Sequence, residues 1–213
     1  MATNTQEIIT SFELYVDDAT ELSSAEELTL ANKIYRKVLN NRPWAFLKKS
    51  FSGATTANVD YVALPSDFKY IISNYNYTDN SIETYVPSAP VVVFVGAKYD
   101  PYRVVNWSDR RQYRNQSNIC YIDPVTNRLY FTRTPTASEA IEFDYVYKPD
   151  DLTLATRPVW DSDFDDIIMH GMASEDYIIQ QFDKAKSYAQ ENQLKYNNYL
   201  LDMQYQDAQF SMN

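Results

Sequence analysis

Glycine is scarce in this chain, and its scarcity excludes two kinds of nucleotide-binding site. The 213 residues include only three glycines, Gly53, Gly96 and Gly171, which lie far apart in the sequence. Phosphate-binding loops and dinucleotide-binding fingerprints need clustered glycines, because backbone N–H groups must come close to the phosphates. The chain can therefore build neither of these sites.

Cysteine and histidine occur once each, as Cys120 and His170, and this limits covalent and metal chemistry. A lone cysteine cannot form a disulfide within the chain, which fits assembly in a cytosolic compartment. Zinc sites take several His or Cys ligands, so the usual kind of zinc site is excluded within one chain. We expect no metal and no other cofactor.

Long apolar runs and an excess of positive charge are also missing. The longest purely apolar run is VVVFV at 91–95, too short to cross a membrane. The N-terminal residues lack the basic and apolar segments of a signal peptide, so we expect a soluble protein with no membrane contact. The formal net charge is −10. Because nucleic-acid binding depends on Lys and Arg neutralising phosphates, a chain-wide grip on nucleic acid is disfavoured.

Tyrosine, in contrast, is abundant, with nineteen copies in the chain. Its side chain combines a large contact area with a polar tip and is enriched at protein–protein interfaces, although it is also common in sheets. A hydrophobic content of 45% is ample for a packed core. The composition favours a folded protein that binds other proteins.

The order of sequence patterns predicts helices, then a sheet, then helices again. Capping boxes beginning at Asn4 and at Ser23 or Ser24 predict two N-terminal helices. Short β-branched and aromatic runs between turn-forming residues predict strands, with a hairpin at CYIDPVTNRLYFT, and helical spacing returns from about residue 162. We predict an α+β fold, a helical scaffold with an inserted antiparallel β region. Its parts are N-terminal helices at 1–53, the β region at 54–150, and C-terminal helices at 151–213 that pack with the N-terminal helices as one domain.

The stretch DSDFDDIIMHGM is the densest group of possible metal ligands. Asp161, Asp163 and Asp165 match the first three ligands of a calcium loop. Asp166 stands where that loop needs glycine, however, and Met172 stands where it needs a bidentate glutamate. We interpret the aspartates as caps that satisfy free N–H groups and complement the helix dipole. The alternative is an aspartate-based, metal-dependent hydrolase, which would hold a divalent ion at Asp161, Asp163, Asp165 or Asp166.

Helical spacing places Asp163, Asp166 and His170 on one face, away from the apolar stripe. We expect this face to meet solvent or a partner, with a weak ion pair between Asp166 and His170. No serine or cysteine is related to His170 by spacing, so a catalytic role is disfavoured.

Glu175 falls inside the apolar stripe of the same helix. A lone buried carboxylate is costly, so it needs a cation or stays protonated. We therefore predict a structural ion pair between Glu175 and an arginine, with Arg36, Arg42 and Arg157 as candidates.

The stretch WSDRRQYRNQ is the only local cluster of arginine and aromatic side chains, formed by Arg110, Arg111, Tyr113 and Arg114. Such a cluster can bind nucleic acid through phosphate contacts and base stacking. In a chain of net charge −10, docking on an acidic partner surface is the interpretation that we favour.

Four segments in order, LSSAEELTLANKIYRKVLNNRPWAFLKKS, YVALPSDFKYIIS, CYIDPVTNRLYFTRTP and YVYKPDDLTLATRPVWDSDFDDIIMHGMASEDY, resemble head–tail adaptor (connector or neck) proteins of tailed bacteriophages. The resemblance implies a structural virion protein without an active site, assembled in the host cytoplasm. Such adaptors form rings, typically twelve-fold, beneath the portal protein. The ring extends the channel through which DNA passes without sequence-specific binding, and it docks the next neck or tail-tube protein.

A ring of this kind needs two different complementary faces on each subunit. We place one face on the weakly amphipathic C-terminal helix, which carries Tyr188, Tyr196 and Tyr199. The exposed strands and the arginine cluster are candidates for the other. The competing interpretation is another virion module, a stopper, decoration or receptor-binding protein, in which the β region is the binding end.

Overall fold

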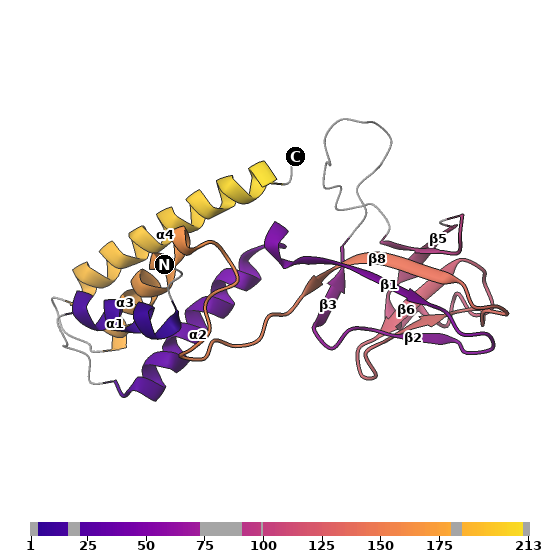
Figure 1. The fold of residues 1–213 in the computed structure, drawn as a ribbon, viewed down its shortest axis with the longest axis horizontal. Coiled ribbons are helices and arrows are strands. Elements are labelled where there is room, and N and C mark those ends of the chain that lie inside the picture. The colour runs from indigo at the N-terminus through magenta and orange to yellow at the C-terminus, as the bar shows by residue number, and fades with distance from the viewer. Residues whose placement is uncertain (1–3, 17–21, 73–90, 99, 180–184, 211–213) are drawn as a thin grey trace. The chain divides into compact units, whose positions relative to one another are not determined.

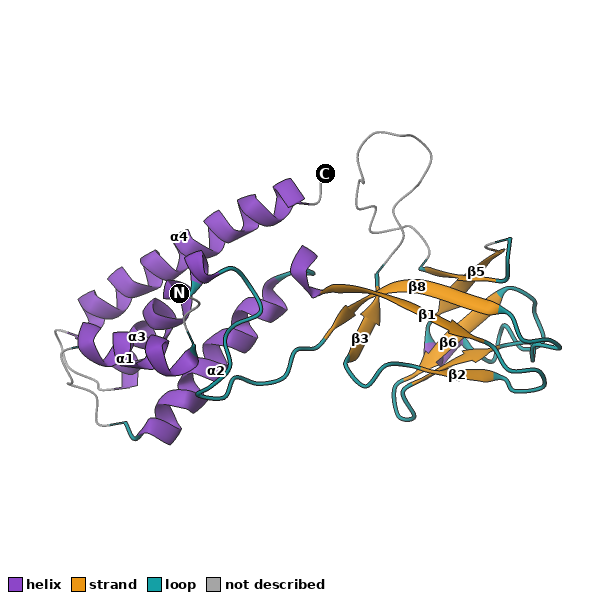
Figure 2. Ribbon diagram, in the orientation of Figure 1, coloured by secondary structure: helices purple, strands orange, loops and turns teal. Residues whose placement is uncertain are grey.

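The computed structural model describes residues 4–16, 22–72, 91–98, 100–179 and 185–210 (Figure 1). The chain divides into two compact units: a helical unit of Met1–Phe46 with Pro149–Asn213, and a β unit of Leu47–Lys148. In the described part of the chain the α-helices all belong to the first unit and the strands to the second (Figure 2). The predicted α+β class, with helices at both ends of the chain, is confirmed.

The helical unit contains four α-helices: α1 (Thr5–Tyr15), α2 (Ser24–Asn41), α3 (Asp166–Ile179) and α4 (Ala185–Phe210). Both predicted capping boxes are present. Glu7 N donates to Asn4 Oδ1 at 2.9 Å while the Glu7 carboxylate accepts from Asn4 N at 3.1 Å, and the Glu26 carboxylate accepts from both N and Oγ of Ser23, at 2.8 and 2.6 Å. These local bonds satisfy N–H groups that have no partner inside a helix. At the start of α1, Thr5 N and Gln6 N also donate to the distant Thr156 and Leu154 carbonyls.

The core of the helical unit depends on a close approach of α2 to α3. A Cβ placed on Gly171 in α3 would lie 2.5 Å from Cγ2 of Ile34 in α2, so only glycine fits there. Ile167 and Ile168 of α3 are fully buried beside it. At the end of α2, the buried Trp44 donates from Nε1 to the Val38 carbonyl at 2.8 Å, which satisfies one of the free C-terminal carbonyls.

The segment that returns from the β unit is held along α2 by polar contacts. Asn32 accepts from Leu152 N at 2.7 Å and donates to the Leu152 carbonyl at 3.0 Å, as a neighbouring strand would. Arg36 forms an ion pair with Asp151. These contacts bring the segment to Trp160, whose ring packs 5.1 Å from that of Tyr35.

The β unit is one mixed sheet in the order β1-β8-β4-β5-β6-β7-β2, with β3 also paired to β8. The predicted hairpin is confirmed as β6 and β7, with the turn closed by Val125 N donating to Asp123 Oδ1 at 2.9 Å. The sheet is antiparallel except for β5 and β6, which pair in parallel. The strands are β1 (Lys48–Ala54), β2 (Tyr61–Ala63), β3 (Phe68–Ile71), β4 (Val92–Val95), β5 (Asp100–Val105), β6 (Ile119–Asp123), β7 (Arg128–Phe131) and β8 (Ala140–Tyr147).

Two details of the sheet differ from the sequence-based expectation. The first strand begins at Lys48, earlier than the expected start at 54, because β1 takes its conformation from seven register pairs with β8 and not from its own composition. The parallel β5–β6 pair needs a crossover connection in place of a tight turn. Residues 106–118 supply it, and we call them the crossover loop.

The β core is apolar and closely packed. Val93, Cys120, Leu129 and Ile141 are completely buried in it. Burial raises the pKa of the Cys120 thiol well above its ordinary value, so the thiol stays protonated and behaves as a small apolar side chain. None of the described helices combines the length and apolar character needed to span a membrane.

Candidate functional site

The aspartate-rich segment forms an acidic turn, residues 161–166, at the start of α3. A 3-10 turn over Ser162–Phe164 leads into the helix, and Asp163 N donates to Asp161 Oδ1 at 3.2 Å. The predicted capping role is thereby confirmed for Asp161. Asp161, Asp163 and Asp166 are exposed, whereas Asp165 is buried. The turn presents three carboxylates to its surroundings.

These aspartates do not converge on a common point. Among the residues that the structure describes, no group of three or more His, Cys, Asp or Glu side chains is arranged to hold a metal ion. Asp166 instead accepts a hydrogen bond from Tyr199 Oη of α4 at 3.2 Å. The geometry gives no support to a hydrolase built on this turn.

His170 does not lie on an exposed face, so that expectation was wrong. It is 7% exposed, with its ring edge-on to Tyr15 and stacked on Tyr199. His170 Nδ1 lies 2.9 Å from Asn192 Oδ1. Asn192 Nδ2 donates to the Tyr188 carbonyl, so Oδ1 is the acceptor and His170 Nδ1 carries the proton. The periodicity of α3 shows a polar face, but it does not show that α4 covers it.

Glu175 is held by two lysines of α2 and by none of the expected arginines. Its carboxylate lies 2.7 Å from Lys33 Nζ and also contacts Lys37, and its side chain is 19% exposed. Burial raises the pKa of Glu175, but the two ion pairs outweigh burial and hold it below its ordinary value. The candidate arginines bind elsewhere: Arg36 to Asp151, Arg42 to Asp207, and Arg157 to the Trp160 carbonyl.

The three tyrosines expected at an interface on α4 occupy different surroundings. Tyr188 is 51% exposed, whereas Tyr196 and Tyr199 are half-buried in the contact with α3. Burial raises the pKa of Tyr196, and burial together with the Asp166 carboxylate raises that of Tyr199. Tyr196 and Tyr199 therefore join α4 to α3, and Tyr188 is the most exposed of the three.

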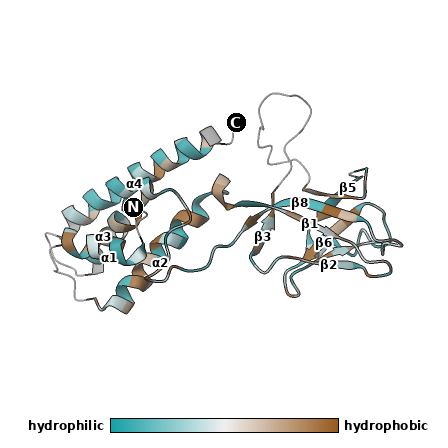
Figure 3. Cartoon of the chain, viewed as in Figure 1, coloured by the Kyte–Doolittle hydropathy of each residue, from teal (hydrophilic) through white to brown (hydrophobic). Residues whose placement is uncertain are grey.

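The outer face of α4 also carries apolar side chains that the sequence analysis did not select. Leu194, Leu201 and Tyr205 are 61%, 50% and 71% exposed. Their spacing of seven and then four residues places them on one face of a helix. Figure 3 shows α4 as a largely hydrophilic helix with a few apolar interruptions. The spacing is visible in the sequence and was the available signal.

The crossover loop of the β unit carries the predicted arginine cluster. Arg110 places its guanidinium 3.5 Å from the centre of the Trp107 ring and donates from Nη1 to the Trp107 carbonyl at 2.6 Å. Trp107 is 43% exposed. Arg111 and Arg114 are exposed, and Tyr113 is half-buried. The loop thus presents an aromatic ring together with three cationic side chains.

The crossover loop is anchored to the sheet beneath it. Asn115 N donates to the Thr132 carbonyl at 3.2 Å, and Thr132 Oγ1 donates to the Gln116 carbonyl at 2.6 Å. Asn115 and Asn118 take left-handed backbone conformations, with φ of 64° and 57°, which asparagine tolerates better than most residues. The loop backbone and the Trp107–Arg110 pair are therefore held in position before any partner arrives.

Residues 3–213 match the model of the SU10 adaptor protein family. The chain belongs to this family. The match covers both units and confirms the resemblance to bacteriophage head–tail adaptors that the order of sequence segments indicated. A comparison with curated proteins gave no match.

An adaptor of a bacteriophage particle is a structural component whose work is to contact other particle proteins. The family gives no reason to expect catalysis, so the relevant sites are contact surfaces. The described residues offer three: the acidic turn, the outer face of α4 and the crossover loop. Trp107 begins the predicted WSDRRQYRNQ stretch but was not named as a contact residue, and the apolar side chains of α4 were not predicted.

Proposed function

We propose that this adaptor works as a ring beneath the portal protein, extending the DNA channel and docking the next neck or tail-tube protein. The match of residues 3–213 to the SU10 adaptor protein family carries the proposal. The proposal includes a twelve-fold ring, assembly in the host cytoplasm and a final place at the head–tail interface of the virion.

The uneven distribution of charge supports a ring built head to tail. Nineteen of the 29 acidic residues but only eight of the 19 basic residues belong to the helical unit, which gives it a net charge of −11. The β unit holds ten acidic and eleven basic residues, a net charge of +1. Closed rings with heterologous interfaces join two different faces of the same chain, and opposite charges steer such faces together.

Each of the three contact surfaces is one face of the proposed ring subunit. The acidic turn, with Asp163 and Asp166, and the crossover loop, with Arg110, Arg111, Tyr113 and Arg114, are the charged faces. The outer face of α4 is the apolar face offered to portal or tail. His170 and Glu175 act inside the helical unit, because they are engaged by Asn192 and by two lysines.

The acidic balance also suits a channel wall. DNA binds proteins chiefly by exchanging counterions for Lys and Arg, so a wall of net negative charge lets DNA slide through without retaining it. Two expectations follow: no sequence-specific binding, and little binding to duplex DNA at physiological salt.

The test is to measure the mass of the purified chain in solution, alone and mixed with the portal protein of its phage, and to image the mixture by negative stain. We expect a ring stacked on the tail-facing side of the portal. A chain that stays monomeric and ignores the portal contradicts the proposal. Binding to the capsid surface or to a host receptor instead identifies a decoration or receptor-binding module.

A further inference from the structure

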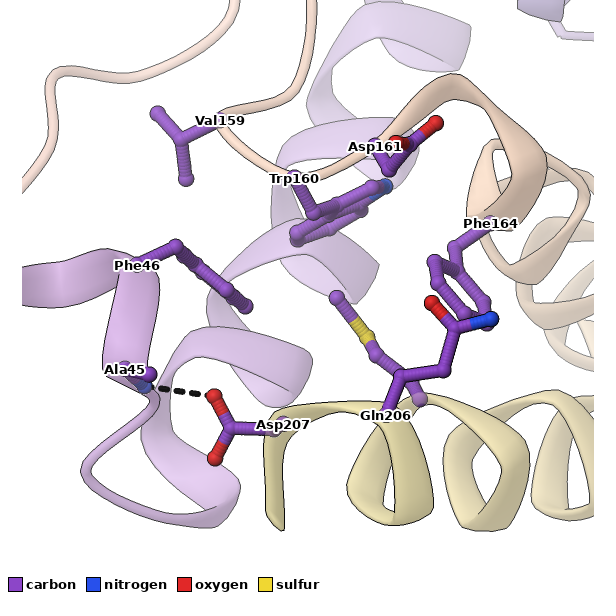
Figure 4. A pocket seen from close by; sticks show the side chains of 9 residues that line it. Ala45, Phe46, Val159, Trp160, Asp161, Phe164, Gln206 and Asp207 are labelled. Carbon is purple, nitrogen blue, oxygen red and sulfur yellow. Dashed lines mark hydrogen bonds between the residues drawn. The ribbon is translucent and has the colours of Figure 1, made fainter. Parts of the chain in front are cut away.

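The helical unit contains an apolar pocket next to the acidic turn (Figure 4). Its volume is about 550 Å³, and Figure 4 shows the rings of Phe46, Trp160 and Phe164 around it. Met203 of α4 also lines it, and the exposed Asp161 stands at its edge. We call it the Trp160 pocket. Its lining combines large apolar side chains with a carboxylate, which suits an aromatic residue accompanied by a cation.

A buried hydrogen-bond donor lies in the wall of the pocket. Trp160 is 4% exposed, and its Nε1 has no hydrogen-bond acceptor within the described part of the chain. Buried tryptophan N–H groups usually find an acceptor, because an unpaired buried donor is costly. Because the Nε1 atom itself is buried, it belongs to the wall of the pocket and is not a contact point for an occupant.

The chain itself presents a feature that complements this pocket. Trp107 stands on the anchored crossover loop with one face of its ring under Arg110, and the exposed Arg111 and Arg114 follow. Tryptophan and arginine are the residues most often found at the energetic centres of interfaces. The loop belongs to the β unit of net charge +1, and the pocket belongs to the helical unit of net charge −11.

We propose that the crossover loop of one copy docks on the helical unit of the next copy, with Trp107 inserted in the Trp160 pocket. The loop arginines face Asp161, Asp163 and Asp166 of that neighbour. The inference rests on the proposed ring, and it identifies the two faces that the ring joins. A second copy is the occupant, since this chain alone supplies both complementary parts.

The first test removes the indole side chain that is proposed to enter the pocket. Trp107→Ala changes an exposed side chain, so the chain is expected to fold as before, with an unchanged circular dichroism spectrum. We expect the concentration needed for ring assembly, measured by sedimentation alone and with portal, to rise at least tenfold. The matched control is Val125→Ala, which trims another exposed apolar residue of the β unit, at 87% exposure, and leaves assembly unchanged.

The second test reverses the charges. Arg110→Glu with Arg111→Glu, and separately Asp163→Lys with Asp166→Lys, each place like charges at the contact and lower assembly at least tenfold. An equal mixture of the two variants restores assembly, because each variant then meets a complementary neighbour. Restoration in the mixture also requires that the contact join two copies and not two parts of one.

The outcomes separate this inference from the proposed function. If the unchanged chain forms no ring with or without portal, the proposed function fails and this contact fails with it. If the unchanged chain forms rings and Trp107→Ala forms them equally well, the ring stands and this contact is overturned. If the Trp107→Ala variant still forms oligomeric rings but these no longer bind the portal protein, the loop docks on the portal, which also overturns the inference.

Discussion

The two units of this adaptor are stabilised by different kinds of contact. In the described part of the helical unit, eight polar or charged residues are buried, among them Glu27, His170, Asp176 and Asn192. The β unit buries only Thr55 in this way, and its core is filled by apolar and aromatic side chains such as Phe51 and Phe143, stacked 4.7 Å apart. The helical unit therefore depends on paired polar groups, and the β unit on apolar burial.

This difference fits the proposed ring, in which the helical unit supplies the acidic face and the β unit is a rigid support for the crossover loop. Buried polar networks fix one arrangement of helices, since each group needs its own partner. An apolar sheet core gives rigidity with little sensitivity to pH or salt.

The largest expected fall in the free energy of unfolding comes from loss of apolar burial in the β unit. Ile141→Ala removes a completely buried side chain of β8 and is expected to lower the free energy of unfolding by about 2–5 kcal/mol. Urea unfolding at low and at high salt should give the same loss. Ile141→Val is the matched control, at about 0.5–1.5 kcal/mol. A loss that changes strongly with salt would contradict an apolar basis for this unit.

The next effect is loss of a buried polar partner in the helical unit. Asn192→Leu introduces an apolar side chain of similar size and branching, and leaves His170 Nδ1 without its acceptor. We expect the free energy of unfolding to fall by about 1–3 kcal/mol. Gln193→Leu, at the exposed neighbouring position, is expected to stay within about 0.5 kcal/mol of the unchanged chain. Equal effects of the two substitutions in thermal unfolding would show that the buried pair has no special weight.

Glu175 gives a smaller effect that depends on pH. The pKa of Glu175 in the folded chain lies below its ordinary value. The contribution of the ionised carboxylate to the free energy of unfolding is therefore complete above the ordinary pKa, and it is lost as the pH falls through the pKa of the folded chain. Glu175→Gln is therefore expected to cost about 0.5–1.5 kcal/mol at neutral pH and nothing in strong acid. The control is Gln193→Leu, which changes no ionisable group and should give no such pH-dependent difference.

Local chemistry explains which elements the sequence could predict. The capping boxes at Asn4 and Ser23 and the Asp123 turn involve neighbours in sequence, and all three were predicted correctly. The start of β1 at Lys48 and the parallel pairing of β5 with β6 depend on strands distant in sequence. No local pattern encodes such a register, so these features required the structure.

The contact surfaces divide in the same way. The arginine cluster could be predicted because its charges are adjacent in sequence, whereas the Trp160 pocket combines residues from three distant segments. For His170, the periodicity of α3 predicts a polar face, but the covering of that face by α4 cannot be inferred from α3 alone. For Glu175 the need for a cation was inferred correctly from burial, but the lysines of α2 can be identified only once α2 and α3 are packed together.

The smallest expected effect is a change in the rate at which Cys120 is labelled, which distinguishes opening of the β core from opening of the helical core. Cys120 is completely buried in the β unit, and burial raises its thiol pKa, so almost no reactive thiolate exists at pH 8. A thiol-specific reagent at pH 8 should leave the native chain unlabelled for hours, and should label it once per chain in urea. Because opening the β core is the only route to the thiol, the labelling rate measures that opening. Asn192→Leu should leave the rate unchanged and Ile141→Ala should raise it; a rise with Asn192→Leu would show that the two cores open together.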